Sequence, residues 1–177
     1  MKIRKKISTT LNSISSKIFS DPKIIRGVLK PLIVNLINLI TFGRGIKVNI
    51  GGQGVYKLSP QFYFSNWENF GDKHNSGFSS CLENSINKKV VLDIGAHIGL
   101  YSLPLSSRIS PEGKIYAFEP SEINRRFLKK NLELNKIQNV DVLPYLVGSK
   151  DLQNIEFYED SKEVNPMGGI ILSKYMN

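Results

Sequence analysis

The stretch of residues 89–103 constrains the fold of this chain more than any other feature of its sequence. A short apolar run ends at Asp93, Gly95 and Gly99 follow four positions apart, and an apolar segment begins at Leu100. A buried parallel strand, a glycine turn and the start of a helix explain this order. The glycines permit a sharp turn, and the N–H groups that open the helix would face the polar end of a ligand.

A second predicted strand, residues 114–118, also ends in an acid. In Rossmann-like units such an acid accepts hydrogen bonds from a ribose diol and lies about 20 residues after the glycine turn. Glu119 lies 20 residues after Gly99. The two strand ends therefore predict one ligand site that contains both Asp93 and Glu119.

The residues after Glu119 predict a helix and a third strand. Ser121 would cap the helix, Asn135 would end it in the left-handed conformation, and residues 140–146 return as a strand. The predicted outward face of the helix is basic and consists of Arg125, Arg126, Lys129 and Lys130. Strand, helix, strand, helix, strand is the order of an α/β fold with a parallel sheet.

Nicotinamide-dependent dehydrogenases use a similar framework, with the pattern Gly-x-Gly-x-x-Gly. Here the two glycines stand four apart, and Asp93 precedes them. A methyl donor carries a charged amino acid end where a dinucleotide carries a pyrophosphate. The two glycines, in register with Asp93 and Glu119, therefore favour a methyl donor.

The stretch DIGAHIGLYSL, followed by GKIYAFEPSEINRRFLKKNLELN, closely resembles the FkbM-type methyltransferase family, which is class I and Rossmann-like. The resemblance covers residues 90–148 well and residues 55–80 faintly. It implies S-adenosylmethionine as cofactor, with its methionine end on residues 93–97, its ribose on Glu119 and its adenine near residues 146–148. The predicted cofactor-binding residues are Asp93, Gly95, Ala96, His97, Gly99, Glu119 and Val147.

His97 stands where the family often carries Asn or another small polar residue. An imidazole titrates near neutrality, so His97 is a candidate general base. Alternatively, it only shapes the turn and touches the cofactor. No residue is assigned as catalytic, and the acceptor that the resemblance implies is a hydroxyl of a small molecule or a sugar.

The chain ends at Asn177, before the further central strand and the acidic segment found in family members. Residues 155–158 predict one more strand, and residues 165–169 a loop. Without a neighbour, the strand at residues 90–94 would have an exposed edge. We therefore expect a truncated gene product, a fragment or one half of a split protein. A partner chain is a candidate to cover the exposed sheet edge. The alternative function is that of a non-catalytic, cofactor-binding or membrane-associated remnant.

The N-terminal third differs in charge from the rest. Up to Pro60 the chain has 11 Lys and Arg against the single acid Asp21, and from Gln61 onward 13 against 14. A near-neutral catalytic part argues against a nucleic-acid substrate. We expect a basic helical leader over residues 1–45, a hairpin and aromatic subdomain over 46–88, and an incomplete S-adenosylmethionine-binding domain over 89–177.

The leader has two interpretations. Residues 28–42 are fewer than the ~20 apolar residues of a spanning helix, and the charged start lacks the apolar run of a signal peptide. Ile33, Leu36, Ile37 and Ile40 repeat at helical spacing. They would pack on the catalytic domain or a partner chain, which is the commoner reason for such a stripe, or contact an anionic membrane surface.

Residues 46–50 and 55–58 predict a hairpin with a glycine turn. The aromatic cluster that follows is predicted to form the core of this subdomain rather than a stacking platform, and consists of Phe62, Tyr63, Phe64, Trp67 and Phe70. Cys81 is the only cysteine, and with two histidines the chain offers no zinc spacing. A reducing, cytoplasmic setting without a metal fits this composition.

Overall fold

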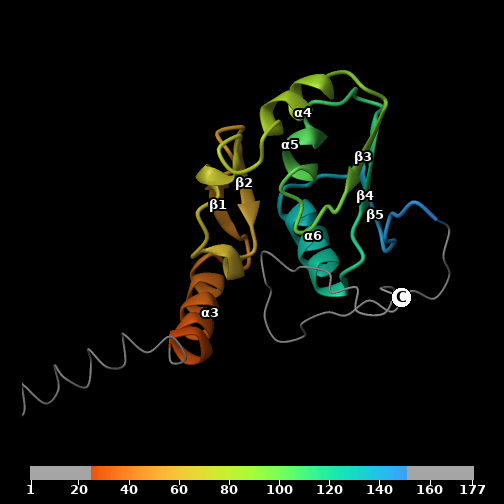
Figure 1. Ribbon diagram of the computed structural model, residues 1–177. Coiled ribbons are helices and arrows are strands. Elements are labelled where there is room, and N and C mark those ends of the chain that lie inside the picture. The colour runs from red at the N-terminus through yellow and green to blue at the C-terminus, as the bar shows by residue number, and fades with distance from the viewer. Residues whose placement is uncertain (1–24, 151–177) are drawn as a thin grey trace, which may run out of the picture.

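The computed structural model describes residues 25–150 (Figure 1). The elements are η1 (Ile25–Leu29), α3 (Lys30–Ile40), β1 (Ile46–Asn49), β2 (Val55–Leu58), η2 (Pro60–Phe62), η3 (Glu68–Phe70), α4 (Phe78–Asn84), β3 (Val90–Ile94), α5 (Ser102–Ser106), β4 (Lys114–Phe118), α6 (Glu122–Leu134) and β5 (Val140–Leu143). The predicted strand at residues 155–158, the loop at 165–169 and the first 24 residues of the leader lie outside the described residues.

Strands β3, β4 and β5 form a parallel sheet in that order. Val91 lies opposite Ile115, and Ala117 lies opposite Val142. Each crossover between neighbouring strands contains a helix, α5 for the first and α6 for the second. The predicted Rossmann-like α/β fold and its strand order are therefore confirmed.

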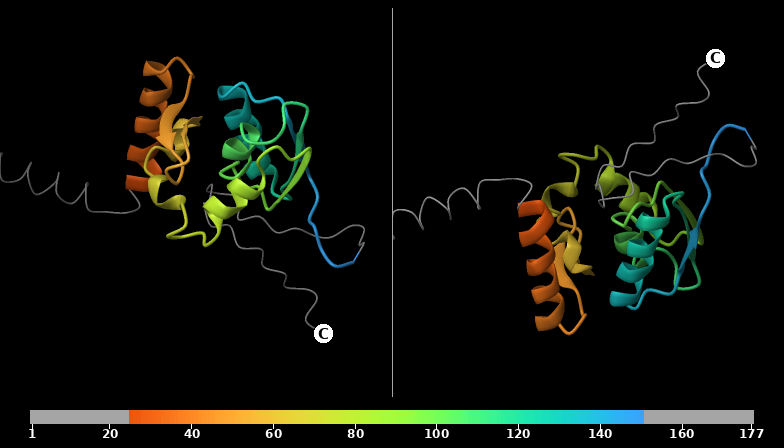
Figure 2. Two further views of the ribbon diagram at one scale, coloured as in Figure 1. Left: turned by 90° about the horizontal axis from the view of Figure 1, so that it is seen from above. Right: turned by 90° about the horizontal axis from the view of Figure 1, so that it is seen from below.

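The described residues form successive layers. Helices α5 and α6 contact the sheet, and α6 also contacts the antiparallel β1–β2 hairpin. Figure 2 shows α3 on the far side of the hairpin from the sheet. One face of the sheet is therefore covered by helices, and α3 is the outermost element at the opposite side of the molecule.

Asn131 of α6 and Asn135, the residue that follows the last turn of α6, fix the hairpin to the sheet domain. The Asn131 Oδ1 accepts from the Ser59 N–H and its Nδ2 donates to the Ile98 carbonyl, both at 2.9 Å. The Asn135 Oδ1 accepts from the Lys57 N–H at 2.9 Å, and its Nδ2 donates to the Lys57 carbonyl at 2.7 Å. These bonds join the N-terminal part and the sheet through α6.

Three predicted boundaries are wrong. Asn135 is not left-handed, because its side chain is engaged with β2, and the next residue, Lys136, takes the positive φ of 57°. Strand β5 ends at Leu143 rather than at residue 146, because Pro144 has no N–H to donate to a ladder. Helix α5 begins only at Ser102, after a turn that follows Gly99.

Four of the five aromatic residues form two pairs, and the fifth, Phe70, is half-buried against the core with its ring edge to face with Phe78. Phe62 and Trp67 are buried with their rings edge to face, and the Trp67 indole N–H donates to the Phe62 carbonyl at 3.1 Å. Tyr63 and Phe64 are both 54% exposed and contact each other edge to face. The predicted core role is confirmed for the first pair and wrong for the second, because the turn after η2 directs the second pair outward.

Helix α3 also departs from the predicted packing. Val34 is buried and Ile37 is half-buried, whereas Leu36 and Ile40 are exposed. The outward side of this helix is therefore not packed on the described part of the chain, and its packing on a partner chain stays a prediction. None of the helices within residues 25–150 has the length and apolar character needed to cross a bilayer.

Candidate functional site

The turn between β3 and α5 is attached to the end of β4. The N–H groups of Gly95 and Ala96 both donate to the Phe118 carbonyl, at 2.9 and 3.0 Å. His97 has a positive φ of 50°, a conformation uncommon in residues with a side chain. These bonds bring the carboxyl ends of β3 and β4 together, as the sequence predicted.

The two glycines of the turn are needed for different reasons. Gly95 has a φ of 79°, and a Cβ placed there would meet no atom within 4 Å. Gly99 has a φ of 97°, and a Cβ there would lie 2.6 Å from the Leu128 Cδ1. Gly95 therefore leaves open space at the turn, whereas Gly99 allows close packing against α6.

Glu119 is buried and connects the turn to the start of α6. Its Oε2 accepts from the His97 N–H at 2.7 Å. Its Oε1 accepts from the Ser121 N–H at 3.0 Å and from the Asn124 Nδ2 at 3.3 Å. These donors hold the buried carboxylate in place at the end of β4.

Asp93, at the carboxyl end of β3, is buried and accepts a 2.5 Å hydrogen bond from the Ser102 hydroxyl. Burial raises the pKa of Asp93, the bonds from Ser102 oppose this, and the charge of Glu119 raises the pKa further. The two predicted acids are therefore near enough to influence each other. The carboxylate of Asp93 is bound to the first residue of α5, so it also anchors the turn.

Sequence reasoning missed Ser102 and Asn124. Ser102 is the first residue of α5, and Asn124 lies one helical turn after the cap residue Ser121. The Ser121 hydroxyl accepts from the Asn124 N–H at 3.0 Å, which confirms the predicted cap. Polar residues in the first turn of a helix that follows a strand-end acid were the signal that could have identified them.

Val147 lies in the segment after β5 and is 44% exposed. The Glu119 N–H donates to the Leu143 carbonyl at 3.0 Å, so this segment starts beside the end of β4. Figure 1 shows the segment then extending away from the sheet. A role for Val147 at the adenine stays a prediction.

The basic face of α6 is only partly solvated. The Arg125 Nη1 donates to the Glu119 carbonyl at 2.9 Å and also to the Pro120 carbonyl. The prediction of an outward role is therefore wrong for Arg125, because its side chain satisfies carbonyls ahead of the helix. Arg126, Lys129 and Lys130 are exposed, as predicted.

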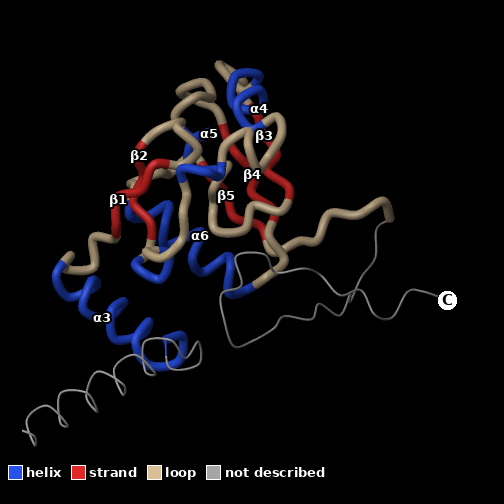
Figure 3. Tube along the Cα trace, turned by 60° about the vertical axis from the view of Figure 1, so that its left-hand side comes forward, coloured by secondary structure: helices blue, strands red, loops and turns tan. Residues whose placement is uncertain are grey.

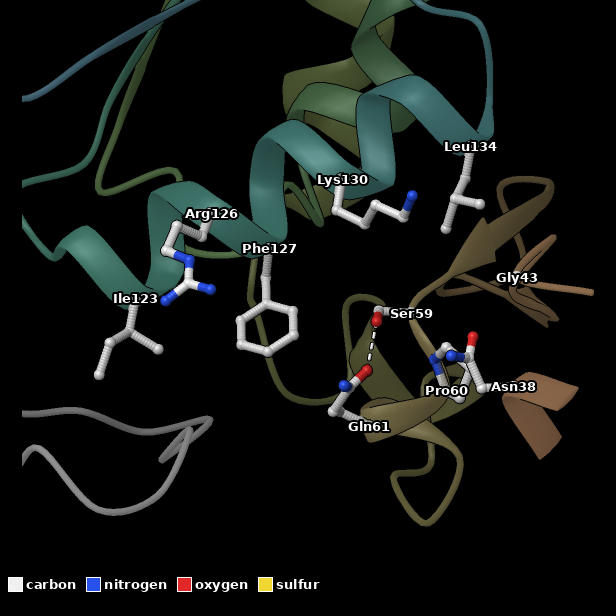
Figure 4. A pocket seen from close by; sticks show the side chains of 10 residues that line it. All are labelled: Asn38, Gly43, Ser59, Pro60, Gln61, Ile123, Arg126, Phe127, Lys130 and Leu134. Carbon is white, nitrogen blue, oxygen red and sulfur yellow. Dashed lines mark hydrogen bonds between the residues drawn. The ribbon is translucent and has the colours of Figure 1, made fainter. Parts of the chain in front are cut away.

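A cavity of about 420 Å³ lies between α6 and the N-terminal part (Figure 4). It is lined by Asn38, Gly43, Ser59, Pro60, Gln61, Ile123, Arg126, Phe127, Lys130 and Leu134. None of the predicted cofactor residues lines it. Within residues 25–150, no three His, Cys, Asp or Glu side chains gather as a metal site would require, and Cys81 is a free, exposed thiol.

The chain matches parts of two curated proteins, and no family model matches it. It is 54% identical over 43 residues to the AMB antimetabolite synthetase AmbE of Pseudomonas aeruginosa. This match covers 24% of this chain and 2% of that protein. It is also 33% identical over 69 residues to a tRNA(Phe) (4-demethylwyosine(37)-C(7)) aminocarboxypropyltransferase of Methanocaldococcus jannaschii. That match covers 39% of this chain and 26% of that protein. The chain thus spans about a quarter or less of these relatives.

Three similar solved structures are described as a methylase or a methyltransferase. An rRNA methylase from Streptococcus thermophilus is 18% identical, with a TM-score of 0.36 and 40% of each chain covered. A SAM dependent methyltransferase from Aquifex aeolicus is 27% identical, with a TM-score of 0.35 and coverage of 38% of this chain and 37% of that one. A putative O-methyltransferase from Klebsiella pneumoniae is 17% identical, with a TM-score of 0.35 and coverage of 40% and 32%.

Proposed function

We propose that this chain binds S-adenosylmethionine at the β3–α5 turn and forms the cofactor-binding part of an FkbM-type O-methyltransferase. The observation that carries the proposal is the buried Glu119 carboxylate, held at the end of β4 by the His97 N–H of the glycine turn. The acceptor proposed is a hydroxyl of a small molecule or a sugar, in a cytoplasmic setting.

The chemistry of the turn fits this cofactor. Gly95 is exposed, and the space where its Cβ would lie is open, so a ligand can approach the backbone. Glu119 offers carboxylate oxygens to ribose hydroxyls, as acids at this strand end do. Asp93 and Glu119 are carboxyl groups at one end of the sheet, which suits a ligand with an ammonium and a sulfonium better than a pyrophosphate.

When bound, the cofactor would supply a methyl group on a positively charged sulfur; the acceptor oxygen would bond to the methyl carbon as the carbon–sulfur bond breaks, and the neutral thioether would be the leaving group. In this proposal Glu119 orients the ribose, and Asp93, bound to Ser102, keeps the turn in place. The main chain of His97 orients Glu119, which favours a shaping role for His97 over that of a general base. Within residues 25–150, no side chain is proposed to remove the acceptor's proton.

The second candidate is a protein that binds the cofactor without transferring its methyl group. The specific observation that favours it is the position of β3 at the edge of the described sheet. Transfer of a labelled methyl group to hydroxylated acceptors distinguishes the two, because only the first proposal predicts a methylated product.

Calorimetric titration of the full chain with S-adenosylmethionine and with its demethylated product tests binding. Glu119→Ala should weaken binding about tenfold or more, because a hydrogen bond to a charged group contributes about 1.5–3 kcal/mol. Glu112→Ala is the matched control, since Glu112 is an exposed acid just before the amino end of β4. No heat with the native chain, or native affinity in a folded Glu119→Ala variant, would refute the proposal.

A further inference from the structure

Helix α3 presents an apolar stripe to solvent. At 100° per residue, five residues fall within a sector of about 120° on one side of the helix. Their exposed fractions lie between 38% and 71%. This outward stripe consists of Leu32, Ile33, Leu36, Leu39 and Ile40.

The opposite side of α3 is the side that the protein itself uses. Val34 is 8% exposed and Ile37 is half-buried, and the helix contacts η2. The helix is thus apolar on two sides, and within residues 25–150 only one side is covered. Exposed apolar patches of this kind mark sites of interaction with a protein or a membrane.

The charge around the stripe selects between these two occupants. Residues 1–44 contain nine Lys and Arg against the single acid Asp21. Lys30 begins the helix, and Arg44 follows its last turn. An apolar stripe beside positively charged residues complements an anionic lipid surface. Basic groups bind the lipid phosphates, and apolar side chains enter the headgroup boundary.

The position of α3 gives such a surface access. Figures 2 and 3 show the helix at one side of the described chain, beyond the β1–β2 hairpin and away from β3, β4 and β5. Phe42, in the turn after the helix, is 83% exposed and adds apolar area beside the stripe. A flat surface can therefore reach α3 without meeting the end of the sheet where Glu119 lies.

We propose that α3 lies in the plane of an anionic membrane surface, with its outward stripe in the headgroup boundary and the cations Lys30 and Arg44 on lipid phosphates. The inference goes beyond the proposed function and does not depend on it. It assigns the N-terminal part of the chain a role in localisation, with the cofactor turn on the side away from the lipid.

Co-sedimentation of the full chain with vesicles tests this proposal. The native chain should bind vesicles of phosphatidylcholine and phosphatidylglycerol, bind phosphatidylcholine alone weakly, and lose affinity in high salt. Leu36→Gln with Leu39→Gln should reduce binding about tenfold or more, because both exposed leucines lose their apolar contact with the lipid. Thermal unfolding followed by circular dichroism verifies that this variant folds.

Leu92→Gln with Ile94→Gln is the matched control, because these β3 side chains are about as exposed as Leu36 and Leu39 but lie on the sheet. Native binding by this control supports the proposal. The proposal is overturned if the native chain does not bind anionic vesicles, or if the folded α3 variant binds them as the native chain does. A native dimer that the α3 variant converts to a monomer also overturns it, since the stripe would then contact a second copy.

Discussion

The two faces of the β3–β4–β5 sheet are built from the same strands but have different surroundings. On one face Ile115 and Ala117 are fully buried under the helices. On the other face Val90, Leu92 and Ile94 are between 59% and 61% exposed. The side of the sheet formed by Ile115 and Ala117 of β4 is therefore covered, and the side formed by Val90, Leu92 and Ile94 of β3 is open.

The difference shows that β3 has apolar side chains that no other part of residues 25–150 covers. Val90, Val91 and Leu92 are consecutive and apolar, which is typical of a parallel strand buried on both faces. Only Val91 and Asp93 point to the covered side. The apolar sequence of β3 is thus suited to burial on both faces, and we propose that a further polypeptide segment packs on the open face.

The open face of the sheet also differs from the outward stripe of α3. Lys114 on β4 and Asp141 on β5 form an ion pair at 2.9 Å on this face, so both signs of charge are present. Within residues 25–44, which contain α3, the charged residues are all cations, namely Arg26, Lys30 and Arg44. This contrast is why lipid is proposed for the helix and protein for the sheet.

The largest effect is expected on the covered face. Ile115→Ala should lower the free energy of unfolding by about 2–5 kcal/mol, because it leaves a cavity in the core. Urea unfolding of the native chain and the variant, followed by circular dichroism, measures the difference. A cost below about 1 kcal/mol would show that the helices do not cover this face in solution.

Asp93 is the charged residue of the covered face, and its effect depends on pH. Because burial raises its pKa, the folded chain holds this proton more tightly than the unfolded chain, in which the carboxyl has its ordinary pKa of 3.8. The stabilisation is complete below pH 3.8 and is lost as pH rises through the folded-state pKa. The native chain should therefore lose stability relative to Asp93→Asn over that range.

Urea unfolding of both proteins at a series of pH values tests this expectation. At each pH, the free energy of unfolding of the variant is subtracted from that of the native chain. This difference removes the effect of the other acids, which titrate in both proteins. Asn at position 93 can still accept from the Ser102 hydroxyl, so the comparison isolates the charge. A difference that grows in favour of the native chain with rising pH would contradict the burial of this carboxyl.

The smallest effect is expected on the open face. Leu92→Ala should cost about 1 kcal/mol or less, because the side chain is already mostly in water. The same urea titration measures it beside Ile115→Ala. If the two variants cost equal amounts, the open face is covered in solution, and a concentration-dependent midpoint would identify that cover as a second chain.

The spacing of particular residues was enough to predict much of the site. Asp93, Gly95 and Glu119 occupy positions that a strand, turn and strand must bring to one sheet edge, because parallel strands place their carboxyl ends together. Ser102 and Asn124 could not be predicted as partners of the acids. Their roles depend on where α5 and α6 begin, and sequence patterns define such boundaries poorly.

The sequence by itself determined the order of strands and helices, the two strand-end acids and the cationic character of the leader, because these follow from residue periodicity and charge. Only the tertiary structure decided which apolar surfaces are covered. Leu36 and Leu92 have the pattern of core positions, yet both face solvent. Burial depends on what packs opposite a side chain, and that neighbour is set by distant segments of the chain.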